Sequence, residues 1–179
     1  MNRTTALKKF TEWDKQGRYV FTLADLNKIF AEDSPKTLQA GLNRLVKDGL
    51  LARPVRGIYV FNFAHSQDSY TIEHIARALR RGEYNYVSLE SALSEYGIIS
   101  QIPIDRLTVM TTGRKGTYAT PFGTIEFTHT KRQQQDILAG MVQTNRPLKI
   151  ATPEYALRDL KRVGRNVHLV NEKALLNDA

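Results

Sequence analysis

The chain has 179 residues, of which 41% are hydrophobic and 25% charged, and its formal net charge is +8. This balance is typical of a soluble globular protein, and the length allows one domain or two small ones. Cysteine is absent, which excludes disulfides, thiolate nucleophiles and cysteine-ligated zinc. Neither a membrane-spanning stretch nor the apolar run of a signal peptide is present, so we expect a cytoplasmic protein with no membrane partner.

Three helices and a short strand are predicted at the start of the chain. Apolar residues at helical spacing indicate a first helix over residues 6–13, which Gly17 can end. Residues 19–21 form a short β-prone run. Thr22 precedes Asp25 by three residues, a capping signature that predicts a second helix of about ten residues.

The third predicted helix, Pro35 to Asp48, is the most informative segment. Ser34 is a typical N-cap, and proline is tolerated at the first helical position. The apolar residues cluster on one face with Gly41, which we expect to allow close approach of a neighbouring helix. The opposite face carries amides and cations with no acid before Asp48, and Ala40 on it permits close approach to DNA. A merely solvated face is the alternative. The candidate DNA-binding residues of this helix are Lys36, Thr37, Gln39, Asn43, Arg44 and Lys47.

A hairpin is predicted after this helix. Gly49 can end the helix, and residues 50–52 and 58–61 indicate two strands. The turn between them carries Arg53 and Arg56 at its tip, as further DNA-binding candidates. This order of elements is that of a winged helix, in which a helix enters the major groove and the hairpin lies over phosphates or the minor groove. We therefore predict a winged helix-turn-helix DNA-binding domain over residues 1–64.

Residues 68–179 predict a second domain of mixed α/β type, so that the whole chain is of the α+β class. A helix is expected from about residue 72, and Ser88 is expected to cap a short helix over residues 89–96. Further helices are predicted over residues 133–142 and from residue 153. Strands are predicted over residues 107–111, 118–120 and 124–128, with a turn at residues 113–116.

The charge distribution suggests a possible second basic surface. Residues 1–64 hold 11 basic and 6 acidic residues, residues 65–104 hold 3 and 5, and residues 105–170 hold 11 and 5. Two basic regions thus flank an acidic middle, although charge alone gives only non-specific attraction to polyanions. A basic surface facing an acidic protein or nucleic acid is one interpretation of the second region, and solvated side chains are the other. Its candidate residues are Arg114 and Lys115 in the predicted turn, and Arg158, Lys161 and Arg162 on one face of the last predicted helix.

The sequence contains no recognisable motif for catalysis, cofactor binding or metal binding. The glycine-rich turn at residues 113–116 lacks the lysine and hydroxyl of a P-loop, and the four histidines provide no helical metal pair. Asp105, Glu126 and Lys131 are the residue types of a metal-dependent nuclease, but Glu126 and Lys131 would face opposite sides of a strand. We expect neither an enzyme, a metal site nor a cofactor. A nuclease targeted by the winged helix and a protein-interaction module without specific DNA binding remain the alternatives.

Three segments carry a resemblance to a known family: residues 49–61, residues 86–97 (YVSLESALSEYG) and residues 151–157 (ATPEYAL). Over about residues 3–163 the chain resembles the AbiEi-type antitoxins of type IV toxin–antitoxin systems, also described as abortive-infection transcriptional regulators. The resemblance implies a winged-helix domain that binds operator DNA and represses the antitoxin–toxin operon. It also implies a second domain directed at a nucleotidyltransferase-type toxin as functional partner, with a direct complex left open. It assigns no active-site residue.

Overall fold

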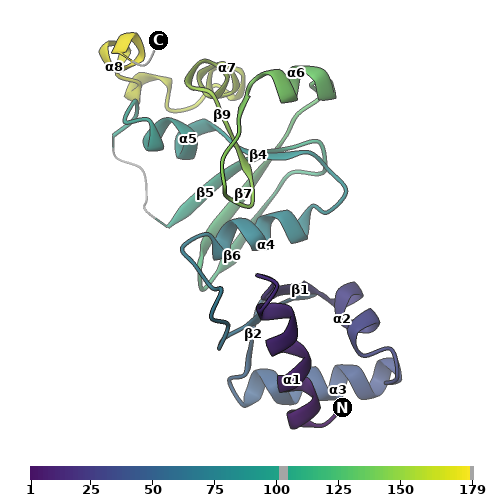
Figure 1. Cartoon of the computed structure of the whole chain (residues 1–179). Coiled ribbons are helices and arrows are strands. Elements are labelled where there is room, and N and C mark those ends of the chain that lie inside the picture. Colours follow the sequence, from purple (N-terminus) through teal and green to yellow (C-terminus); the bar gives the residue numbers. More distant parts are fainter. Residues whose placement is uncertain (101–104, 178–179) are drawn as a thin grey trace. The chain divides into compact units, whose positions relative to one another are not determined.

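The computed structural model describes residues 1–100 and 105–177 (Figure 1). The chain divides into two compact units, Met1–Leu79 and Arg80–Ala179. The first combines helices with a small antiparallel sheet and the second contains a mixed six-stranded sheet, which confirms the predicted α+β class. Among the described residues, no helix has the length and apolar character needed to cross a bilayer.

The first unit contains four helices and three strands. In chain order these are α1 (Arg3–Asp14), β1 (Val20–Thr22), α2 (Leu23–Ile29), α3 (Pro35–Lys47), β2 (Leu51–Val55), β3 (Ile58–Phe61) and α4 (Thr71–Leu79). The sheet has the order β1-β3-β2, with antiparallel pairing on both sides of β3. Figure 1 shows α1, α2 and α3 beside this sheet.

Local sequence explains where these helices begin. Thr22 and Asp25 form the predicted capping box, because the Thr22 side chain accepts from the Asp25 backbone and the Asp25 carboxylate accepts from the Thr22 backbone. Ser34 caps α3 by accepting from the Thr37 backbone, ahead of the proline at the first helical position. Both predictions are confirmed, and α3 ends at Lys47, within one residue of the predicted bound.

The core of the first unit is built around Phe10. Its ring lies 5.3 Å from that of Phe21, 5.7 Å from Phe30 and 5.6 Å from Phe61, so that α1, α2 and the sheet meet there. Gly41 is buried, but the group closest to its missing side chain is the Met1 side chain, 2.7 Å from an ideal Cβ. The prediction that Gly41 admits a neighbouring helix is therefore wrong, since a flexible methionine fills that space.

Helix α4 belongs to the first unit through contacts with β1 and β3. The buried Tyr19 hydroxyl lies 2.9 Å from Thr71 Oγ1, and the Tyr19 ring meets the His74 ring edge-on at 5.2 Å. The connector before α4 is held by Asp14, whose carboxylate accepts from the backbones of His65 and Ser66. The sequence predicts this helix in the second domain, whereas in the structure it belongs to the first compact unit. The functional division between the two parts stays a prediction.

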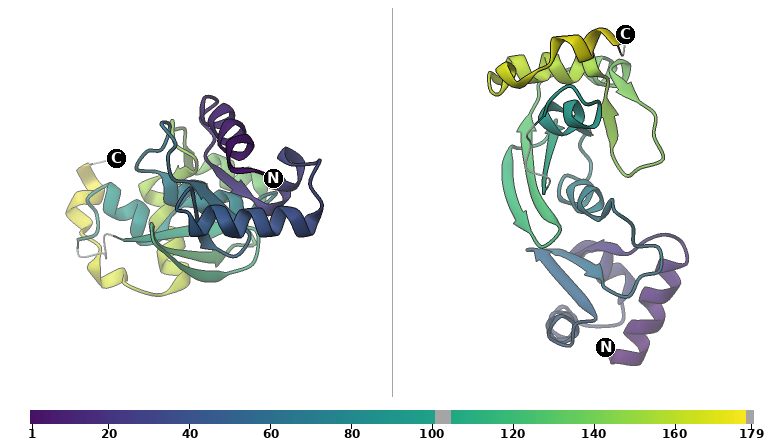
Figure 2. Two further views of the ribbon diagram at one scale, coloured as in Figure 1. Left: turned by 90° about the horizontal axis from the view of Figure 1, so that it is seen from below. Right: turned by 90° about the vertical axis from the view of Figure 1, so that its left-hand side faces the viewer.

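The second unit contains a six-stranded sheet of order β6-β7-β5-β4-β9-β8, in which β5 pairs parallel to β7 and β4 parallel to β9. Helix α5 packs against α7 and β5 (Figure 2). The strands are β4 (Asn85–Val87), β5 (Arg106–Thr111), β6 (Gly116–Thr120), β7 (Gly123–His129), β8 (Met141–Val142) and β9 (Lys149–Ala151). The helices are α5 (Leu89–Glu95), α6 (Gln134–Ala139), α7 (Pro153–Val163), the short 3-10 helix η1 (Val167–Leu169) and α8 (Glu172–Asn177).

Two local predictions in this unit are wrong. The helix predicted over residues 133–142 stops at Ala139, because Met141 and Val142 pair with β9 as strand β8. The Ser88 side chain does not cap α5. Its hydroxyl donates instead to the buried carboxylate of Asp159 on α7, at 2.8 Å. The Ser88 hydroxyl therefore donates to the buried Asp159 carboxylate and does not form the cap at the N-terminus of α5 that the sequence pattern predicts.

Candidate nucleic-acid interface

Helix α3 is anchored by one face and displays the other. Leu38, Gly41, Leu42 and Leu45 are buried, so the opposite side of the helix faces solvent. Of the predicted DNA-binding residues on that side, Gln39 is half-buried and the remaining five are exposed, namely Lys36, Thr37, Asn43, Arg44 and Lys47. The structure therefore brings the six helix candidates onto one solvent-facing surface.

The cations of this surface have no acidic partners in the part of the chain that the structure describes. In the described parts of the chain, no carboxylate lies within ion-pairing distance of Lys36, Arg44 or Lys47, although Lys9, Lys15 and Arg18 of the same unit do have acidic partners. Exposed cations without acidic partners on one helix are suited to phosphate binding, because they can replace the counterions condensed on a nucleic acid and release them.

Two amides lie on the same surface and are joined. Gln39 Nε2 donates to Asn43 Oδ1 at 3.0 Å, one helical turn along. Thr37 has a different role, since its backbone donates to Ser34 and its hydroxyl lies 2.8 Å from the Ser34 hydroxyl. Thr37 therefore contributes to the N-cap of α3, and its predicted contact with DNA remains a prediction.

The β2–β3 hairpin carries the two predicted wing arginines at different places. Arg56 lies exposed in the turn, next to Gly57, whose φ of +83° suits glycine. Arg53 is exposed but lies within β2, and its guanidinium carbon is 5.8 Å from the centre of the Tyr59 ring. The prediction that both sit at the tip is wrong for Arg53. Strand β2 continues through Pro54 because it is an edge strand with a register shift at this point, where a missing backbone N–H is tolerated.

The residues of the possible second basic surface are all exposed and come from two places. Arg114 and Lys115 lie between β5 and β6, and the main chain there is held by Arg80, whose Nε donates to the Arg114 carbonyl at 2.9 Å. Arg158, Lys161 and Arg162 lie on α7, with the Arg158 guanidinium 5.0 Å from the Tyr155 ring centre. That these five residues act as one surface stays a prediction.

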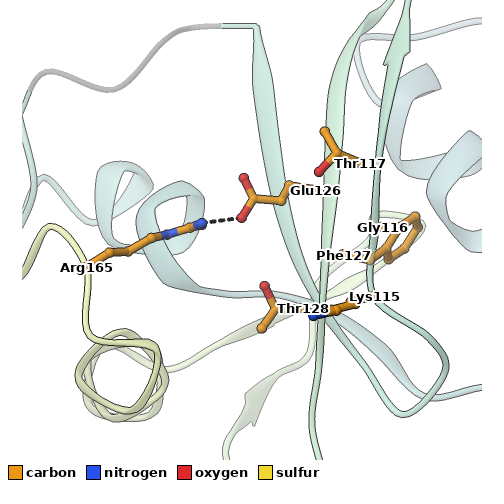
Figure 3. Close-up of a pocket in the computed structure, with 7 residues that line it drawn as sticks. All are labelled: Lys115, Gly116, Thr117, Glu126, Phe127, Thr128 and Arg165. Carbon is orange, nitrogen blue, oxygen red and sulfur yellow. Dashed lines mark ion pairs between the residues drawn. The ribbon is translucent and has the colours of Figure 1, made fainter.

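A hollow of about 590 Å³ in the second unit is lined in part by Glu126, one of the residues of the nuclease alternative. It is lined by Lys115, Gly116, Thr117, Glu126, Phe127, Thr128 and Arg165. Figure 3 shows Arg165 reaching Glu126 from the segment after α7, and Arg106 binds the same carboxylate at 2.5 Å. Within residues 1–100 and 105–177, no group of three or more acids and histidines is placed to hold a metal. The Glu126 carboxylate therefore forms ion pairs with the guanidinium groups of both Arg106 and Arg165. Lys131 lies two residues beyond the end of β7 at His129.

Arg165 also binds a second acid, which the sequence patterns did not indicate. Its Nε lies 2.7 Å from Glu90 Oε1 on α5, and Asn166 donates to the same oxygen at 3.0 Å. Burial raises the pKa of Glu90, but the hydrogen bonds from Arg165 and Asn166 outweigh it, so that the pKa lies below its usual value. These residues are 75 positions apart in the chain, and no local pattern could pair them.

The arrangement of α2, α3 and the β2–β3 hairpin defines the first unit as a winged helix-turn-helix, and the cations on the outward face of α3 have no acidic partner among the described residues. Residues 11–62 match the AbiEi_4 family model, described as "Transcriptional regulator, AbiEi antitoxin", which confirms the resemblance for this segment.

The fold of most of the chain, beyond residues 11–62, is also similar to a solved structure. The crystal structure of the RV2827C protein from Mycobacterium tuberculosis is similar with a TM-score of 0.60 at 17% sequence identity. The match covers 88% of this chain and 60% of that protein, so the chain spans less than two thirds of its length. At this identity the likeness concerns the fold alone. No curated protein matches the chain.

Proposed function

We propose that this protein binds double-stranded operator DNA through α3 and the β2–β3 wing and represses transcription of its own operon. The observation that carries the proposal is the outward face of α3, on which Lys36, Arg44 and Lys47 have no carboxylate partner among the described residues. The match of residues 11–62 to a transcriptional-regulator family supports the same reading of this face.

In this mechanism α3 lies in the major groove and the hairpin lies beside it. Lys36, Arg44 and Lys47 bind phosphates along the groove, which positions the helix without selecting a sequence. Arg56 at the hairpin turn extends the contact to a neighbouring phosphate or to the minor groove. Because the buried face of α3 is fixed by packing, the helix meets DNA as a rigid element that requires little reorganisation.

We extend the proposal to an antitoxin role, in which the second unit acts on the side of a nucleotidyltransferase-type toxin. Support comes from the resemblance of residues 86–97 to AbiEi antitoxins. The test is growth during co-expression of a nucleotidyltransferase encoded beside this gene. Protection should persist in a variant whose α3 cations are removed, and loss of protection in that variant would contradict a separate second-unit role.

The DNA-binding proposal is tested with two matched triple variants, each of which removes three exposed cations from one helix. Lys36→Ala/Arg44→Ala/Lys47→Ala should weaken binding to the DNA upstream of the operon and reduce its salt slope by about three units. Arg158→Ala/Lys161→Ala/Arg162→Ala on α7 should leave both the DNA affinity and its salt slope nearly unchanged. The measurement is a titration of labelled DNA at several salt concentrations, with thermal unfolding as a check on folding. Equal losses in the two variants would contradict the assignment to α3.

A further inference from the structure

We infer that Gln39 and Asn43 act as one hydrogen-bonded unit that recognises an A·T base pair, with Ala40 against the thymine methyl group. The inference rests on the proposed function, since it requires α3 to lie in the major groove. It adds to that function the chemical identity of a base pair in the operator.

The hydrogen bond between the two amides fixes what each can offer to DNA. An amide side chain has two N–H donors and a carbonyl oxygen with two lone pairs. With Gln39 Nε2 donating one N–H to Asn43 Oδ1 at 3.0 Å, the Asn43 NH₂ group, the second Gln39 N–H and the Gln39 carbonyl remain available. If the two amides were both turned over, the remaining donor would be on Gln39 and the remaining acceptor on Asn43. In either orientation the pair presents a donor from one residue beside an acceptor from the other.

Adenine is the single base whose major-groove edge matches this pattern. It places the N7 acceptor beside the N6 donor, whereas guanine offers two acceptors there, cytosine one donor and thymine one acceptor. Asn43 is exposed and Gln39 half-buried, so their amide ends lie on the surface that faces the groove. Because each amide restrains the other, less side-chain freedom is lost when the pair binds the base.

Ala40 is a second observation that supports an A·T pair, because it can contact the thymine opposite the adenine. It is exposed on a face whose other members are polar or cationic, and it precedes Asn43 by three residues, which makes the two neighbours on the helix surface. A small apolar side chain at this place can contact the C5 methyl group of thymine. A G·C pair also offers an acceptor beside a donor, on O6 and N4, but it has no methyl group for Ala40. The methyl contact therefore favours A·T.

The experiment combines protein variants with modified operator DNA. The bound site is first located by footprinting the DNA upstream of the operon with the full chain. At each A·T pair in it, adenine is replaced by 7-deazaadenine, which removes N7, or thymine by deoxyuridine, which removes the methyl group. Affinities are then measured for the wild type, Gln39→Ala, Asn43→Ala, the double variant and Ala40→Gly. Lys36→Ala serves as a matched control on the same face.

We expect one base pair at which 7-deazaadenine weakens wild-type binding by about 5- to 100-fold. The same change should have almost no effect on the double variant, and each single variant should lose nearly as much affinity as the double, because the two amides act together. Deoxyuridine at that pair should weaken the wild type but not Ala40→Gly, and Lys36→Ala should lose affinity on all these DNAs alike.

The outcomes separate this inference from the proposed function. Absence of footprinted binding by the wild type would overturn both. Specific binding with additive losses in Gln39→Ala and Asn43→Ala, or with no A·T pair sensitive to 7-deazaadenine, would overturn the amide unit and leave the proposed function intact. Dependence on a G·C pair at the position that these variants affect would overturn the assignment to adenine.

Discussion

The two basic regions of this protein have similar net charge, but the cations of α3 in the first and the paired arginines of the second are used differently. In residues 1–64 the cations of α3 point into solvent without acidic partners among the described residues. In residues 105–170 four of the arginines form ion pairs with acids of the second unit: Arg106 with Glu126, Arg132 with Asp159, Arg146 with Glu95, and Arg165 with both Glu90 and Glu126. A count of charges cannot distinguish cations that face a ligand from cations that hold the fold together.

The difference follows from where the acids lie. Asp159 and Glu90 are buried, and a buried carboxylate is costly unless it is paired and hydrogen-bonded. Arginine meets this requirement best, because its planar guanidinium donates to both oxygens of a carboxylate. Helix α3 contains no buried acid that requires a cationic partner. Two of its three cations are lysines, which act as flexible point charges.

The largest effect on stability should come from breaking the buried Arg132–Asp159 ion pair. Asp159 accepts from Arg132, Tyr86 and Ser88, so Arg132→Met leaves a buried charge without its counterion. We expect the free energy of unfolding of the second unit to fall by about 3–5 kcal/mol. Urea unfolding followed by circular dichroism should shift, while fluorescence of Trp13 in the first unit should not.

Arg158→Met is the matched control for that variant. Arg158 also stacks on the Tyr155 ring, at 5.0 Å against 5.7 Å for Arg132, but it is exposed and has no acidic partner in the described residues. Its removal should change stability by less than about 0.5 kcal/mol. Equal destabilisation by the two substitutions would show that Tyr155 packing matters more than the ion pair.

An intermediate effect is expected at the wing, where the structure separates the two arginines. Arg56→Ala should weaken DNA binding roughly tenfold and lower the salt slope by about one unit, because Arg56 sits in the turn. Arg53→Ala should have the smaller effect, since Arg53 lies in β2 over Tyr59. The measurement is the salt dependence of operator affinity. An unchanged slope in the double variant would remove the wing from the interface.

The smallest effect concerns the pH dependence of the Glu90–Arg165 pair. Since the pKa of Glu90 is lowered in the folded protein, its stabilising contribution is complete above its ordinary value near 4.5 and is lost as pH falls through the folded value. Glu90→Gln should therefore cost on the order of 1 kcal/mol at neutral pH. The difference from wild type should shrink in acid unfolding experiments below that value. A difference that stays constant down to pH 3 would argue against an ionic role.

Predictions from sequence succeeded where the determinant is local. The Thr22 cap, the Ser34 cap and the two faces of α3 depend on spacings of three or four residues, and the structure confirms them. The predictions failed where the local structure depends on a residue or strand that is distant in the sequence. Ser88 turns from its helix to Asp159, and the two-residue strand β8 exists because it pairs with β9. Arg53 lies within β2 and not in the predicted turn, because the edge strand continues through Pro54.

The carboxylate of Asp14 has a practical consequence for dividing this protein. It lies at the end of α1, is only 6% exposed, and its hydrogen-bond donors are residues 65 and 66. A fragment ending at residue 64 would lose those donors and also Thr71, the partner of the buried Tyr19 hydroxyl. It would therefore lose the hydrogen bonds and the packing that these residues give to Asp14 and Tyr19, whereas a fragment ending at residue 79 retains them. We therefore expect an N-terminal fragment that ends after α4 to be more stable than one that ends at residue 64, and a protease to cut more readily after α4 than before it.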